Sequence, residues 1–282
     1  MRSANSRDQA WLQAADALHF TAKKWTNMFR NKGDSIYFYT MHKSASTLFS
    51  DFVLKNLIGL RHVDYIRKLY DGRLNSSRSN PLVFRPRGHV YGPIRVSSDG
   101  TGVDYSEPLN GVTVSPDFVR DKVALFFVRD PRDILVSSYY SFGATHTYSA
   151  RPDIRRAQGI LRSRIQDMSI DDYALEFVQA QVSYFETIHR LSQSCRRGAL
   201  MKYEDMIDNF DYFAGQLTQH IDVHPHVVRQ MYRRSRPRRQ EAVTSHRRSG
   251  KTGGFRHKLQ PSTIAVLNHQ LSGVLQTFDY PL

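Results

Sequence analysis

The chain has 282 residues, 40% hydrophobic and 12% aromatic, which is enough apolar side chain for one sizeable core and argues against disorder. Its single cysteine, Cys195, excludes an intramolecular disulfide and a cysteine-rich zinc site. Basic residues outnumber acidic ones 40 to 26, and eleven of them lie in residues 229–258 beside one acid. Such a concentrated positive segment implies an anionic partner.

The first part of the chain is predicted to be a helical extension, residues 1–32, in which Trp11, Ala14, Ala15, Leu18 and Ala22 recur at helical spacing. We expect the rest, residues 33–282, to form one domain. No run approaches the roughly 20 apolar residues that span a bilayer, and the first ten residues lack the apolar stretch of a signal peptide. The prediction is a soluble, cytoplasmic protein; no oligomeric state is indicated.

Strands and helices are predicted to alternate along the domain. Residues 35–40 have the aromatic and β-branched composition of a buried strand, and a polar loop (41–46) and a helix (47–57) follow. Residues 123–128 are apolar throughout, as in a central parallel strand, and residues 134–142 form the next helix. Further predicted strands are 82–84, 89–91 and 199–203, and further predicted helices are 169–194, 204–220 and 261–278. This order predicts a three-layer α/β/α fold with a central parallel sheet.

The loop after the first predicted strand suits an anion. His42-Lys-Ser-Ala-Ser-Thr47 carries small residues whose backbone N–H groups can converge, and Lys43 adds a full positive charge before a helix N-terminus. The alternative is a helix capped by Ser46 or Thr47 with an exposed lysine. Residue order alone leaves both interpretations open.

A second loop places an arginine at a strand end. In Arg129-Asp-Pro-Arg-Asp133, followed by Ser137 two helical turns later, Arg129 and Ser137 can hold one phosphate between them. The alternative gives Arg129 a structural ion pair.

A third segment, residues 246–256, is basic and spaced by glycines, so its amides can approach a phosphate; the alternative is a surface loop.

Taken together, these motifs resemble the sulfotransferase family. Lys-Ser-Ala-Ser-Thr47 after the first strand, Arg129-Asp-Pro-Arg-Asp with Ser137, Tyr203-Glu-Asp205 and a late Arg248-x-Gly-x-x-Gly253 occur in that family's order over residues 35–282. The resemblance implies a P-loop NTPase-like sulfotransferase fold. It also implies a sulfotransferase that moves a sulfuryl group from 3′-phosphoadenosine 5′-phosphosulfate (PAPS) to an acceptor hydroxyl or amine, leaving adenosine 3′,5′-bisphosphate (PAP).

The resemblance also implies site residues. Lys43 with Ser44, Ala45, Ser46 and Thr47 would hold the 5′-phosphosulfate, and Arg129 with Ser137 the 3′-phosphate. Arg248, Ser249 and Gly250 would close over that phosphate, and Tyr203 would lie near the adenine. Leu48 stands where many members stack a tryptophan on adenine, and Ala45 stands where they have glycine. No metal is required, and no clustered carboxylates suggest one.

An acceptor hydroxyl needs a base, and histidine suits this role because its usual pKa is about 6.5. His89 is the first candidate because it is predicted to follow a strand, near where the family carries its catalytic histidine. His146 is the second candidate, and His42 adjoins Lys43. The acceptor class stays open among small molecules such as phenols and alcohols, lipids and glycans.

Two other classes of protein remain as alternatives. A P-loop kinase or NTPase would need a GxxxxGK[ST] loop, which is absent, and a Mg²⁺-binding acid, for which Asp130 is the sole weak candidate. A nucleic-acid-binding protein would use residues 229–258, but that segment interleaves only Tyr232 and Phe255 with its basic residues. We therefore expect no nucleic-acid partner.

Overall fold

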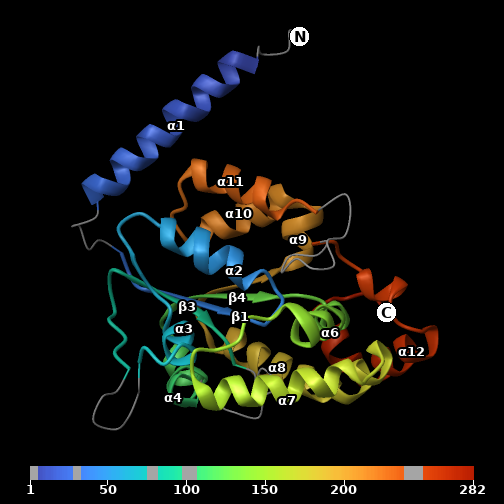
Figure 1. Cartoon of the computed structure of the whole chain (residues 1–282). Coiled ribbons are helices and arrows are strands. Elements are labelled where there is room, and N and C mark those ends of the chain that lie inside the picture. The colour runs from blue at the N-terminus through green and yellow to red at the C-terminus, as the bar shows by residue number, and fades with distance from the viewer. Residues whose placement is uncertain (1–5, 28–32, 75–81, 97–106, 238–249) are drawn as a thin grey trace.

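The computed structural model describes residues 6–27, 33–74, 82–96, 107–237 and 250–282 (Figure 1). Its centre is one parallel sheet with the strand order β2-β3-β1-β4-β5. The strands are β1 (Ile36–Thr40), β2 (Arg61–Val63), β3 (His89–Ile94), β4 (Val123–Val128) and β5 (Arg197–Lys202). The predicted α/β class with a central parallel sheet is confirmed.

Helices cover both faces of this sheet. One face is covered by the helical run after β1, which comprises α2 (Ser46–Leu48), η1 (Phe49–Val53) and η2 (Leu54–Asn56), and by α9 (Tyr203–Asp208), α10 (Phe210–His220) and α11 (Pro225–Ser235). The other face is covered by α3 (Tyr65–Tyr70), α4 (Glu107–Thr113), α5 (Pro116–Val119), α6 (Pro131–Tyr140), α7 (Pro152–Gln166), α8 (Ile170–Ser194), α12 (Pro261–Gln270) and α13 (Ser272–Thr277). Two further short helical segments are η3 (Ser141–Thr145), after α6, and η4 (Gly254–His257), before α12.

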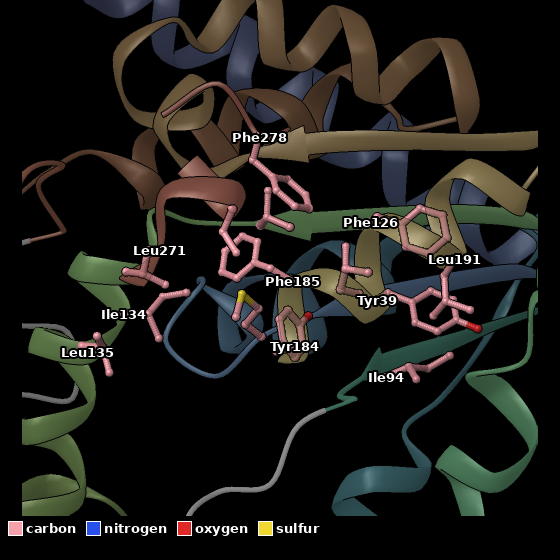
Figure 2. Close-up of a cluster of buried hydrophobic side chains, with 14 of the residues drawn as sticks. Tyr39, Ile94, Phe126, Ile134, Leu135, Tyr184, Phe185, Leu191, Leu271 and Phe278 are labelled. Atoms are coloured by element: carbon pink, nitrogen blue, oxygen red, sulfur yellow. The ribbon is translucent and has the colours of Figure 1, made fainter. Parts of the chain in front are cut away.

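The three layers follow from the alternation of side chains along buried strands. Ile36 and Phe38 of β1 belong to the core under α9 and α10, and Phe38 stacks on Phe49 with ring centroids 4.5 Å apart. Tyr37 and Tyr39 point to the opposite core. Figure 2 shows that core, where Tyr39 and Phe126 of the sheet meet Tyr184 and Phe185 of α8. Each buried aromatic side chain contributes about 1.5–3 kcal/mol, so both faces hold the sheet firmly.

Several predicted elements differ from the structure. Residues 82–84 are not a strand; Phe84 packs as loop against Tyr37 and Tyr91. The predicted helices 204–220 and 261–278 are each divided in two, at Asn209 and at Leu271. Strand β2 was not predicted. Because residues 82–84 form a loop and not a strand, the residues that follow them do not lie at the end of a strand.

The amino-terminal helix α1 (Ser6–Asn27) lies outside the layer formed by α2, α10 and α11 (Figure 1). It packs on α11, where Asp16 faces His226 and Arg229. The helix lies within the predicted helical segment, of which residues 1–5 and 28–32 fall outside the described ones, and the division into an extension (1–32) and one domain (33–282) stays a prediction. Within the described ranges, no helix has the length and apolar character needed to cross a membrane.

Candidate active site

The loop after β1 lies at the topological switch point of the sheet. The chain leaves β1 for β2 and β3 on one side and later forms β4 and β5 on the other, and ligands of open α/β sheets bind in such a crevice. Lys43 and Ala45 both adopt left-handed backbone conformations, with φ of 64° and 55°. Non-glycine residues rarely do so, and such strain is typical of functional loops. Ala45 therefore adopts a backbone conformation that glycine would adopt without strain.

The Lys43 side chain reaches across to the helix that follows β4. Its ammonium donates a hydrogen bond to the Ser141 hydroxyl at 2.7 Å, and Ser141 begins η3 directly after α6. Helix α2 begins after Ala45 without a side-chain cap, so its first backbone N–H groups remain available for other acceptors. The loop thus combines one positioned cation with uncapped amides.

Arg129 follows β4 and connects two loops. Its guanidinium donates to the carbonyl of Lys43 at 2.9 Å and to the carbonyl of Lys251 at 3.2 Å, and it forms an ion pair with Asp133 at 3.4 Å. The guanidinium also lies 4.3 Å from the Tyr203 ring centroid. Its Nε atom is buried without a hydrogen-bond partner among the described residues. Arg129 is a fixed, buried cation at the carboxyl edge of the sheet.

Residues 250–255 are held against this edge by α6 and α9. The Tyr203 hydroxyl donates to the carbonyl of Gly250 at 2.9 Å. The carboxylate of Asp133 accepts from the backbone N–H groups of Gly253 at 2.9 Å and Phe255 at 3.1 Å. These bonds place the late glycine-containing segment beside Arg129.

Glu204 lies behind Arg129. Its carboxylate accepts from the Asp130 backbone N–H at 3.0 Å and from the Tyr280 hydroxyl at 3.3 Å. Burial raises the pKa of Glu204 from its usual value near 4.5 to about 7, although the Asp130 amide and Arg129 act to lower it. Glu204 therefore gains or loses its negative charge near neutral pH, and this changes the electrostatic surroundings of Arg129.

Lys43, Arg129, Asp133, Tyr203 and Gly250 line a cavity of about 510 Å³. The predicted site residues that line it are Lys43, Ala45, Ser46, Thr47, Leu48, Arg129, Ser137, Tyr203 and Gly250. Ser44 belongs to the same loop but is fully buried, and its hydroxyl has no partner among the described residues. Arg248 and Ser249 lie outside the described residues. Segments far apart in the sequence thus meet at one cavity.

His89 does not share this location. It is the first residue of β3, where it pairs with Arg61 and lies next to Val90, the partner of Ile36 at the start of β1. Its ring stacks on Tyr91 at 5.7 Å, and its Nδ1 bonds the carbonyl of Arg87 at 2.9 Å. The prediction that His89 follows a strand, at the edge of Lys43 and Arg129, is wrong, because the strand it was expected to follow does not exist.

The cavity also holds cations that sequence reasoning missed. Arg95 directly follows β3, and its guanidinium donates to the Ser46 hydroxyl at 3.2 Å. The described cavity-lining cations are Lys43, Arg95, Arg129, Arg234, Lys251 and Lys258, against the carboxylates of Asp51 and Asp133. Asp133 is already bonded to the loop amides, and Asp51 forms ion pairs with Lys55 and Arg67. The cavity is therefore strongly electropositive and suits a polyanion.

Two histidines, His42 and His146, line the cavity. His42 is buried, and burial together with Arg95, His146 and Lys43 holds the pKa of its imidazole well below the usual value. His146 follows η3 and lies with its ring 5.1 Å from Phe142. Among the residues described, no group of three or more metal-binding side chains is assembled.

The chain is similar in structure to a solved sulfotransferase. A crystal structure of mouse sulfotransferase SULT7A1 complexed with PAP superposes with a TM-score of 0.53 at 13% identity, covering 88% of this chain and 86% of that one. No family model and no curated protein matches the sequence. The likeness shows that this chain has the sulfotransferase α/β fold.

Proposed function

We propose that this protein is a sulfotransferase that uses PAPS as sulfuryl donor and acts on a hydroxyl or amine of a small-molecule, lipid or glycan acceptor. The observation that carries the proposal is the shared cavity of Lys43 and Arg129. Two cations that follow neighbouring strands line it together, and Arg129 is hydrogen-bonded to the carbonyl of Lys43 itself. The shared fold supports the same class.

Each end of the donor has a matching group. Lys43 and the backbone of residues 44–47 face the place of the 5′-phosphosulfate, with Arg95 beside Ser46 as an additional cation. Arg129, with Ser137 on α6, faces the place of the 3′-phosphate, and Gly250, together with Arg248 and Ser249, completes that side in the proposal. Six cations against two engaged carboxylates match a donor whose two anionic ends carry several negative charges.

The cavity offers the adenine a stacking partner other than the tryptophan that many sulfotransferases use. Leu48 lines the cavity at that position, and one helical turn later Phe52 lines it as well. The Arg234 guanidinium lies over the Phe52 ring, 4.5 Å from its centroid. A ring covered by a guanidinium is a stacking platform for a base. In the proposal, Phe52 and Arg234 contact the adenine while Tyr203 borders it.

Sulfuryl transfer depends on positioned charges more than on a covalent bond between the protein and the transferred group. An acceptor atom attacks the sulfur in line, the bond between sulfur and the 5′-phosphate oxygen breaks, and negative charge grows on that oxygen. Lys43 is placed to stabilise it because Ser141 and the loop fix the side chain at both ends. The ammonium then acts most strongly on the transition state.

Isothermal titration calorimetry with three ligands tests the proposal. PAP is expected to bind at least about 100-fold more tightly than adenosine monophosphate, because only the bisphosphate carries the 3′-phosphate that Arg129 and Ser137 face. Equal affinities for the two would refute the assignment. Tighter binding of ATP with Mg²⁺ than of PAP would favour the kinase alternative. Binding of duplex DNA that displaces PAP would favour the nucleic-acid alternative.

A further inference from the structure

His42 occupies an unusual place, because it directly precedes Lys43 in the loop that follows strand β1. Its side chain lines the cavity while remaining only 9% exposed. The groups that face it are cations or histidine: Arg95 from the end of β3, His146 from the end of η3 and Lys43 from its own loop. Phe142 closes one side, with its ring 5.9 Å away in an edge contact.

We propose that His42 accepts the proton of the acceptor hydroxyl during sulfuryl transfer. This inference rests on the proposed function and adds the missing base to it. In the step, the acceptor oxygen forms a bond to sulfur, and the bond from sulfur to the 5′-phosphate oxygen breaks. The hydroxyl proton moves to a ring nitrogen of His42, and the electron pair of the broken bond stays on PAP beside Lys43. His42 later releases the proton to water.

The surroundings of His42 make this base dependent on the donor. Without ligand, burial and the neighbouring cations Arg95 and Lys43 disfavour the imidazolium, so the ring is neutral and ready to accept a proton. A bound donor brings several negative charges against those same cations. The imidazolium is then favoured, and the pKa of His42 rises toward the range where a general base is effective. The base thus becomes strong only when the phosphates of the donor occupy the cavity.

His146 is the competing candidate and is placed less favourably. It lies on the loop after η3 and is only half-buried, whereas His42 is buried. His42 instead lies two residues after the end of the buried strand β1 and directly before Lys43, in the loop proposed to hold the transferred group. A base on the same loop as the groups that position the donor is held more accurately than one on a separate loop.

Nuclear magnetic resonance of the histidine side chains tests the inference without any acceptor. The His42 signal, assigned as the one missing in His42→Gln, is expected to titrate well below the usual range of a histidine in the free protein. With saturating PAP its midpoint should rise by about one pH unit or more. An unchanged midpoint in the PAP complex would overturn the inference. Absence of PAP binding by calorimetry would instead refute the proposed function.

Transfer rates supply the second test. In the reverse reaction from an aryl sulfate to PAP, His42→Gln should lower kcat about 100-fold for phenyl sulfate and much less for 4-nitrophenyl sulfate, whose phenol is more acidic. PAP affinity should stay within about threefold of wild type, and the control His89→Gln should leave both rates unchanged. Equal losses with both substrates would show a merely structural role. If His146→Gln showed this substrate dependence and His42→Gln did not, the base would be His146.

Discussion

Arg129 and Arg132 are three positions apart but lie in different surroundings, Arg129 directly after β4 and Arg132 in the first turn of α6. Arg132, 1% exposed, is saturated by the protein: it donates to both oxygens of Asp130, to Asn268 of α12 at 2.7 Å and to the carbonyl of Pro281 at 2.6 Å. Arg129 lines the cavity, and its Nε has no partner among the described residues. Identical side chains in one motif therefore have different tasks.

The difference shows how a binding arginine is told from a structural one. A buried arginine whose donors all meet protein acceptors belongs to the fold, and its removal leaves charges without partners. An arginine at the edge of an electropositive cavity has capacity left for a ligand. Arg132 also lies 4.2 Å from the Phe255 ring centroid, which ties the carboxyl-terminal segment to the loop. Four predictions test the contrast.

The largest expected effect is on stability. Arg132→Ala leaves the carboxylate of Asp130 buried without its cation, so the free energy of unfolding should fall by about 3–5 kcal/mol. Denaturant titration followed by circular dichroism measures the loss. Arg156→Ala, an exposed arginine on α7, is the matched control and should change stability by less than about 0.5 kcal/mol. If Arg132→Ala also lowered the free energy of unfolding by less than about 0.5 kcal/mol, Arg132 would not be the structural arginine that we describe.

Arg129→Ala should show the complementary pattern. PAP affinity should fall by about 2–5 kcal/mol, because a phosphate in the cavity loses its buried cation. Calorimetry with PAP and with adenosine monophosphate measures the change, which should be confined to the ligand that carries a 3′-phosphate. An equal loss for both ligands would mean that Arg129 acts on the cavity as a whole through the loops it connects.

Glu204 sharpens the comparison because it contacts the Asp130 backbone and faces Arg129. Its folded pKa, about 7, lies above its unfolded value, so between about pH 4.5 and 7 the folded state binds the extra proton. Stability should therefore decrease as pH rises through this window, by about 3 kcal/mol at most. Glu204→Gln should remove this part of the pH dependence, which thermal unfolding at pH 5 and pH 8 measures. A slope unchanged in the variant would contradict the assignment.

The smallest effect is expected at the opposite edge of the sheet. His89→Gln loses the bond to the Arg87 carbonyl and the ring stacking on Tyr91, at a cost of about 1 kcal/mol. PAP affinity and turnover should stay within about twofold of wild type. A selective loss of turnover in His89→Gln would show that the cavity extends beyond the carboxyl edge.

The sequence predicted the centre of the fold well and its margin poorly. Strands β1 and β4 are continuous apolar or aromatic runs that are buried on both faces, which is the pattern sequence reasoning detects best. Strand β2 has three residues, is partly exposed and contains arginine and histidine, so no pattern marks it. Residues 82–84 look like a strand because Leu82 and Phe84 pack on the core as loop.

The candidate site was predicted where a motif lies beside a strong strand. Lys43 and Arg129 follow β1 and β4 and meet at the cavity. Arg95 was missed because Gly92 and Pro93 suggest the end of a strand, whereas β3 accommodates them where its register with β1 shifts. Arg234 and Lys258 come from other helices and segments, and their convergence depends on packing that no local spacing encodes.

The chain's last residues are part of this arrangement. Tyr280 donates to Glu204 behind Arg129, and the Pro281 carbonyl accepts from Arg132. Neither residue lines the cavity, but Tyr280 contacts α9, which follows β5, and Pro281 contacts the first turn of α6, which follows β4. When related sequences are collected, substitutions at position 280 should covary with position 204, because a hydroxyl and a carboxylate in contact are replaced together. Such covariation would show that the contact between positions 280 and 204 has been maintained as a pair.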